Sequence, residues 1–166
     1  MSSGKTHLKA SLTLSAGFAI GAMVSLDPRV LTCSAGAMAG VLLTPDLDVD
    51  KAYIGDKIIE ERVGWFGKGV WMWFWKPYKT SFKHGQFASH FPIFGTLVRV
   101  FYIYFMLILP FYLIYFLILH SSNYYPWLRS ELEYWGRMFT NPLFLYGLIS
   151  SDLIHYTLDK LTKNAE

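Results

Sequence analysis

The sequence predicts an all-α integral membrane protein with about four transmembrane helices, on three observations. Hydrophobic residues make up 53% of the chain and charged residues only 16%, whereas soluble domains carry about 25% charged residues. The apolar residues gather in runs long enough for the roughly 30 Å hydrocarbon core of a bilayer. The chain also contains 13 Phe, 11 Tyr and 6 Trp, more aromatic surface than a small soluble fold can bury.

These numbers also bound the organisation of the chain. A length of 166 residues favours one membrane-embedded helical domain over residues 1–166. Disordered chains and disulfide scaffolds are excluded, and a soluble enzyme is disfavoured, because charge is scarce and Cys33 has no second cysteine to pair with.

The first two spans are expected at residues 8–26 and 30–44. The first ends at Asp27-Pro28, because proline cannot continue a helix. The second is short and rich in glycine, alanine and serine, which let helices approach closely in lipid. It is therefore expected at the centre of the bundle.

The third span, residues 97–119, is the strongest, because its last twenty residues carry no charge. Pro110 is expected to kink this helix without ending it. The fourth span, residues 139–158, is the weakest by hydropathy, since it contains Asp152 and His155.

The segment at residues 45–92 is expected to form an interfacial aromatic loop. Its stretch GWFGKGVWMWFWKPY, residues 64–78, interleaves tryptophan with lysine, a composition that favours the headgroup zone. It could be an aromatic belt or a lid that guides a lipid headgroup. Seven basic residues in this segment, with further lysines near both ends of the chain, predict a multi-pass protein with both termini on the cytoplasmic side.

The net charge of +3 is too weak to predict nucleic-acid binding, but it suits contact with an anionic leaflet. Membrane lipids are the expected partners, together with a second copy of the chain in a homo-oligomer.

Histidine and aspartate residues gather at the cytoplasmic ends of the four expected spans. On a helix, Asp152 and His155 are separated by three residues, and His155 and Asp159 by four, so all three share one face. Ionisable residues at the end of a membrane helix are costly and usually mark function. The residues expected to bind metal are His7, Asp46, Asp48, His84, His90, Asp152, His155 and Asp159.

Imidazole together with carboxylate is a ligand set for a divalent metal, with zinc expected first and manganese or iron as alternatives. Eight ligands would suit two ions, since one tetrahedral site needs only four. Other readings stay open at single positions: Asp46 and Asp48 could be solvated, and His155 with Asp159 could be a structural hydrogen bond. Asp50 is the weakest member of the group.

The motifs SGKTH, TPDLD, WFWKPY, SHFPIFGTLVR and DxxHxxxD resemble those of small prokaryotic metal-binding membrane proteins, relatives of the YdjM-like inner-membrane metal-dependent hydrolases. The resemblance implies an inner-membrane helical protein whose metal centre acts on phosphoesters. It implies metal ligands at His7, Asp46, Asp48, His84, His90, His155 and Asp159. Gly85 departs from the family pattern, which has Arg there, and this removes a bidentate clamp for phosphate.

The expected function is a metal-dependent hydrolase at the cytoplasmic membrane face, acting on a lipid or other phosphoester, with His7 and His84 as catalytic residues. The alternative is a catalytically inactive, metal-stabilised structural or partner subunit of a membrane assembly. Gly85 and the aromatic third span favour that alternative. A metal transporter is less favoured, because the spans offer few polar groups near the membrane midplane.

Overall fold

The computed structural model describes residues 4–48, 54–82, 90–119 and 126–163, and these residues are almost entirely helical. The all-α class predicted from the sequence is thereby confirmed. The elements are α1 (Gly4–Ser25), α2 (Val30–Ala39), the 3₁₀ turn η1 (Pro45–Asp48), α3 (Ile54–Ser81), α5 (Pro92–Ile103), the π-helical segment η2 (Tyr104–Ile108), α6 (Leu109–Ile114), the π-helical segment η3 (Tyr115–Leu119), α7 (Pro126–Thr140) and α8 (Pro142–Lys163).

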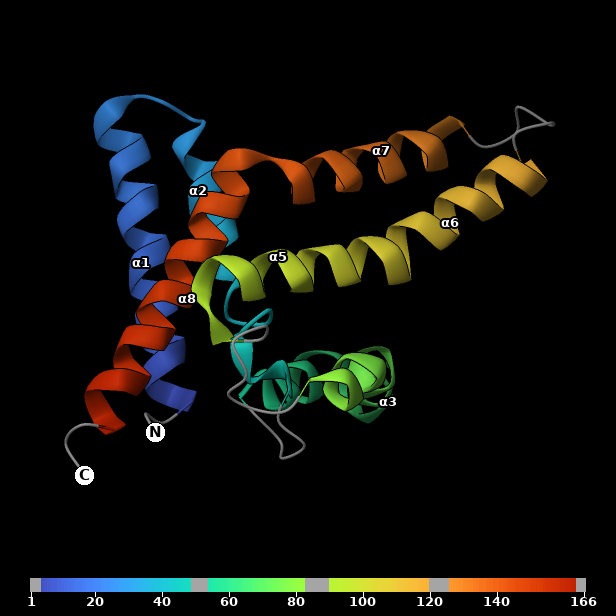
Figure 1. Ribbon diagram of the computed structural model, residues 1–166. Coiled ribbons are helices and arrows are strands. Elements are labelled where there is room, and N and C mark those ends of the chain that lie inside the picture. Colours follow the sequence, from blue (N-terminus) through green and yellow to red (C-terminus); the bar gives the residue numbers. More distant parts are fainter. Residues whose placement is uncertain (1–3, 49–53, 83–89, 120–125, 164–166) are drawn as a thin grey trace.

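Helices α1, α2 and α8 form a closely packed bundle (Figure 1). A Cβ atom on Gly36 of α2 would lie 2.0 Å from the carbonyl oxygen of Phe144 in α8, so only glycine allows this approach. Gly147 of α8 fits equally closely against the backbone of α2. As expected from its small residues, α2 packs against both of the other helices.

Hydroxyl groups join the same three helices. The side chains of Ser11 in α1 and Ser151 in α8 are hydrogen-bonded at 2.8 Å. Ser15 in α1 and Ser34 in α2 are hydrogen-bonded at 2.9 Å. These contacts fix the N-terminal half of α1 against the other two helices, which is the part of α1 that carries His7.

A helical stretch from α5 through η3 crosses α8 with its first part and then extends away from the bundle, and α7 packs back along it (Figure 1). The stretch continues as a helix through Pro110, with π-helical turns on either side. Its only charge in α5 is Arg99, which is fully buried and paired with Asp152 of α8. This ion pair joins the crossing stretch to the bundle.

The expected interfacial loop at residues 45–92 is instead largely helical, because η1 and α3 occupy much of it. The backbone of α3 leaves the helical region at Gly64, where φ is +83°, a conformation that glycine adopts without steric cost. Beyond this kink, Trp75 and Tyr78 are buried while Trp65 and Trp73 are exposed. The aromatic run is therefore an amphipathic helix with one buried face.

One hydrophobic core lies where η1, α3 and α5 meet α8 and the end of α2. Its buried members are Leu43, Leu47, Trp75, Tyr78, Val100, Ile103, Phe144 and Leu148.

The expectation of four membrane spans is not supported. Among the described residues, two helical stretches are long and apolar enough to cross a bilayer, Gly4–Ser25 and Pro92–Leu117. Helix α2 has only ten residues, about 15 Å of helix, which is half of a hydrocarbon core. Helix α8 is long enough but is not apolar enough to qualify, since it contains Asp152, His155 and Asp159.

Candidate metal centre

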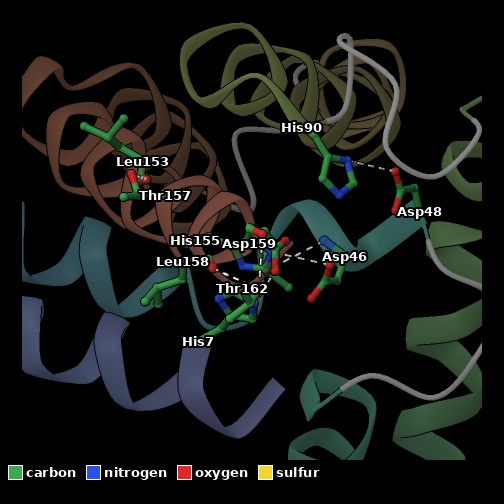
Figure 2. Close-up of polar contacts among 11 residues, drawn as sticks. His7, Asp46, Asp48, His90, Leu153, His155, Thr157, Leu158, Asp159 and Thr162 are labelled. Atoms are coloured by element: carbon green, nitrogen blue, oxygen red, sulfur yellow. Dashed lines mark hydrogen bonds and ion pairs between the residues drawn. The ribbon is translucent and has the colours of Figure 1, made fainter. Parts of the chain in front are cut away.

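Four side chains from three distant parts of the chain meet at one end of the α1–α2–α8 bundle (Figure 2). His7 lies in the first turn of α1, and Asp46 lies in η1, just after α2. His155 and Asp159 lie one turn apart on α8, as their spacing predicts. The close packing of the three helices brings these segments together.

The distances are short enough for a shared centre. Nε2 of His155 lies 3.4 Å from Oδ1 of Asp46 and 3.3 Å from Oδ2 of Asp159. Nε2 of His7 lies 3.2 Å from Oδ1 of Asp159. The two imidazole rings stack, with centroids 3.6 Å apart and planes inclined by 14°. We call His7, Asp46, His155 and Asp159 the four-residue centre.

A hydroxyl group orients the central histidine. Oγ1 of Thr44 lies 3.3 Å from Nδ1 of His155. When Nδ1 carries the proton and donates it to Thr44, the lone pair on Nε2 points at the two carboxylates. The role of Thr44 was not predicted from the sequence. Its position two residues before Asp46 places it near the expected ligands, but does not show that it contacts His155.

The imidazole of His155 and the neighbouring carboxylates shift one another's pKa values, so that each charged form is favoured. Burial lowers the pKa of His155, but hydrogen bonds and charge interactions with Asp159 and Asp46 outweigh burial and raise this pKa from 6.5 to about 9. Burial raises the pKa of Asp46, but its hydrogen bond and charge interaction with His155 leave the pKa below the ordinary value of 3.8. Without a metal ion, the centre therefore holds a protonated imidazole between two carboxylates.

These residues fit a divalent metal ion. His7, His155 and Asp159 each offer a ligand atom, and these atoms all lie within 4.8 Å of one another. Both histidines are buried, and imidazole with carboxylate is a donor set for zinc, manganese or iron. A cation at this position would replace the proton of His155 and remain in contact with two carboxylates.

The opposite end of η1 carries a second, separate pair. Nδ1 of His90 lies 3.4 Å from Oδ2 of Asp48, whose side chain is fully buried. Figure 2 shows this pair lying apart from the four-residue centre, with a contact of its own. Of the eight expected ligands, four therefore meet in one group, and Asp48 and His90 form their own contact.

Asp152 lies outside both groups. Its carboxylate pairs with the guanidinium of Arg99 and accepts a hydrogen bond from the hydroxyl of Thr96, and all three side chains are buried. It shares a helix face with His155, but it is directed at α5 and not at the four-residue centre. The structure thus gives Asp152 a partner in helix packing, and Arg99 is a buried charge that sequence reasoning missed.

Two further positions singled out in the sequence lie outside the described residues. These are His84, with its neighbour Gly85, and Asp50.

An all-helical fold with a buried His/Asp centre at the end of a helix bundle is the architecture of a helical metal-binding protein. The sequence profile of one family, described as "Uncharacterized metal-binding protein (DUF2227)", matches residues 2–166. The chain belongs to this family. No curated protein and no solved structure matches the chain, and none of these comparisons supports a relationship to the YdjM-like hydrolases.

Proposed function

We propose that the four-residue centre binds a divalent metal ion, zinc or else manganese or iron, and hydrolyses phosphoesters at the cytoplasmic face of the inner membrane. The observation that carries the proposal is the convergence of two imidazoles and two carboxylates from α1, η1 and α8. Membership of a metal-binding family supports its first part. The hydrolytic part rests on the chemistry of the donor set.

A bound divalent ion would polarise a phosphoryl oxygen and lower the pKa of a bound water. The surrounding side chains are arranged to serve that chemistry. Thr44 holds the ring of His155, and Asp159 lies between the two histidines. A cavity of about 10 Å³ borders His7, Asp46 and His155, which is close to the space that one water molecule needs.

When Asp46, His155 and Asp159 hold the ion, His7 is not a ligand and is the proposed proton acceptor. Its Nε2 faces Asp159, while its buried Nδ1 has no hydrogen-bond partner among the described residues. A ring held on one side by a carboxylate, with its other nitrogen available, can take a proton from a water in the adjacent cavity.

Hydrolysis is tested with detergent-purified protein loaded with zinc or manganese and a panel of phosphodiesters and phospholipids. We expect cleavage by the wild-type chain, loss of cleavage in Asp159→Asn, and unchanged cleavage in Thr157→Ala, which alters the exposed face of the same helix. Absence of cleavage across the panel by metal-loaded wild-type protein would contradict the catalytic proposal.

One observation favours the second candidate, a metal-stabilised structural or partner subunit. The cavity at the four-residue centre is far smaller than a phospholipid headgroup needs, and both histidines are buried. Structural metal sites are closed, whereas catalytic sites keep an open coordination position. In cobalt-substituted protein, an optical spectrum that shifts on adding azide supports the hydrolase, and a spectrum that azide leaves unchanged supports the structural subunit.

We also propose that the protein is a multi-pass inner-membrane protein with cytoplasmic termini and lipid partners. The apolar lengths of α1 and of α5–η3 support a membrane location, as does the exposure of Phe101, Phe105 and Leu117 on the crossing stretch. The orientation rests on the distribution of lysine and arginine.

The orientation is tested by labelling intact cells with a membrane-impermeant thiol reagent. In a Cys33→Ala background, we expect Arg29→Cys to be labelled in intact cells and Lys160→Cys to be labelled only after lysis. Labelling of Lys160→Cys in intact cells would contradict cytoplasmic termini.

A further inference from the structure

A groove of about 420 Å³ lies between the second half of α3 and the π-helical segment η2. It is separate from the four-residue centre, with which it shares no residue. Its lining residues are Trp73, Phe74, Lys76, Pro77, Thr80 and Met106. We call it the α3–η2 groove.

Contacts between α3 and α5 fix the position of the helix that forms one wall of this groove. Trp75 stacks on Tyr102 of α5 with ring centroids 5.2 Å apart. The hydroxyl of Tyr102 donates a hydrogen bond to the carbonyl of Phe74. Trp75 and Tyr78 are almost fully buried, so α3 is fixed against α5, while Trp73 on the outer side of α3 is exposed. The groove is therefore a feature of the folded chain.

The lining combines an apolar surface with one cation. Trp73 is 75% exposed and Met106 is 39% exposed, which are large fractions for side chains of this kind. Lys76 forms no ion pair with any described carboxylate, whereas Lys68 on the same helix pairs with Glu60 at 2.7 Å. The lysine at the groove is thus available to an anion from outside the chain.

The surroundings point to lipid as the source of that anion. Trp65 and Phe66, next to the kink at Gly64, are 81% and 69% exposed. Exposed aromatic rings beside lysines are typical of helices that lie in the headgroup zone of a membrane. Met106 belongs to Pro92–Leu117, the more apolar of the two candidate spans. One side of the groove is therefore formed by α3, which carries Lys76, and the other side by a candidate membrane span.

We propose that the α3–η2 groove binds an anionic phospholipid. An acyl chain lies against Trp73 and Met106, and the headgroup phosphate contacts the ammonium group of Lys76. This inference rests on the proposed membrane location and is independent of hydrolysis at the four-residue centre.

The test uses the full-length protein in detergent and phospholipids whose acyl chains carry bromine, which quenches tryptophan fluorescence on contact. Brominated phosphatidylglycerol is compared with brominated phosphatidylcholine. For the wild type, we expect saturable quenching at lower concentrations of the anionic lipid. Lys76→Gln and Lys76→Glu should remove this preference, a change of about fivefold or more in half-saturating concentration, from roughly 1 kcal/mol per basic residue.

Two further variants distinguish the contribution of the Lys76 charge from that of the apolar lining. Lys57→Glu makes the same charge change as Lys76→Glu at an exposed position on α3 away from the groove, and it should keep the preference. Met106→Phe narrows the groove without adding a tryptophan and should weaken quenching by both lipids.

Each contrary outcome has a distinct meaning. Equal quenching of wild type by both lipids, or a preference that survives in Lys76→Glu, would overturn the lipid site and leave the membrane location standing. An absence of quenching by either lipid would count against both. Quenching by both lipids that Met106→Phe leaves unchanged would show that the lipids bind outside the groove, and would overturn the site.

Discussion

At the scale of single residues, His155 determines the character of the centre. Its Nε2 faces the carboxylates of Asp46 and Asp159, and its Nδ1 faces Thr44. A buried imidazole with two carboxylate neighbours is stable either as a protonated ring or as a metal ligand. The same geometry therefore predicts how the metal-free protein responds to pH and how strongly a metal is held.

The first prediction concerns the stability of the metal-free protein. The pKa of His155 is raised from 6.5 to about 9, so between these pH values the folded state binds more protons than the unfolded state. The stabilisation is complete below pH 6.5 and is lost as pH rises toward 9, by as much as about 3 kcal/mol. Thermal denaturation in EDTA should show a falling midpoint across this range, and His155→Gln should reduce the slope. A midpoint that stays level or rises would contradict this prediction.

The second prediction concerns Thr44. Thr44→Val keeps the volume of the side chain but removes the hydroxyl that orients His155. Loss of such a supporting hydrogen bond typically weakens metal binding by about tenfold to a hundredfold. Isothermal titration with zinc should show this loss, while Thr157→Val on the exposed face of α8 should bind as the wild type does. Equal affinity in Thr44→Val would show that the hydroxyl does not orient the ligand.

At the scale of the elements, the centre depends on how closely α2 approaches α8. Gly36 and Gly147 place the two backbones in contact, and the serine pair Ser11–Ser151 adds α1 to the same interface. His7 and His155 lie on α1 and α8, so the stacking of their rings at 3.6 Å requires this packing. A disturbance two turns away should therefore reach the centre.

The third prediction tests this dependence. Gly36→Ala would place a Cβ atom 2.0 Å from the carbonyl oxygen of Phe144, so the helices must separate, at a cost of about 1–3 kcal/mol. Gly17→Ala in α1 meets no atom within 4 Å and should be neutral or slightly stabilising. Chemical denaturation measures both changes. Equal stabilities of the two variants would refute the role assigned to close packing.

The elements also show what the sequence could and could not predict. The turn spacing of His155 and Asp159 on α8 was correct, because helical periodicity is a local property. Asp152 lies on the same face of α8, one turn before His155, yet it contacts α5, where it pairs with Arg99. Which neighbour a helix face meets depends on tertiary packing, and a charge such as Arg99 in an apolar run gives no sign of its partner.

At the scale of the whole molecule, composition predicted a helical chain correctly but overestimated the number of spans. Helix α2 has only ten residues, too few to cross a bilayer. Helix α8 is long enough, but Asp152, His155 and Asp159 make it too polar to qualify as a span. The aromatic segment was expected to be an interfacial loop because its tryptophans are interleaved with lysines. The kink at Gly64 and the buried Trp75 and Tyr78 explain how it forms a helix with one packed face.

The whole molecule is thus organised around a centre that ties the start of the chain to its end, since His7 and Asp159 are hydrogen-bonded across 152 residues. If a metal ion occupies this centre, it cross-links α1, η1 and α8, and its binding free energy adds to the stability of the fold. The metal content of the purified protein therefore shows directly whether a metal ion occupies this centre.

Elemental analysis of detergent-purified wild-type protein, His155→Ala, Asp159→Ala and Thr157→Ala provides that measurement. The convergence of these donor atoms on one centre predicts about one divalent ion per chain in the wild type. It predicts loss of the ion in His155→Ala and Asp159→Ala and retention in Thr157→Ala, which changes the outer face of the same helix. Equal metal content in all four proteins, or a wild-type protein that holds no divalent metal, would contradict it.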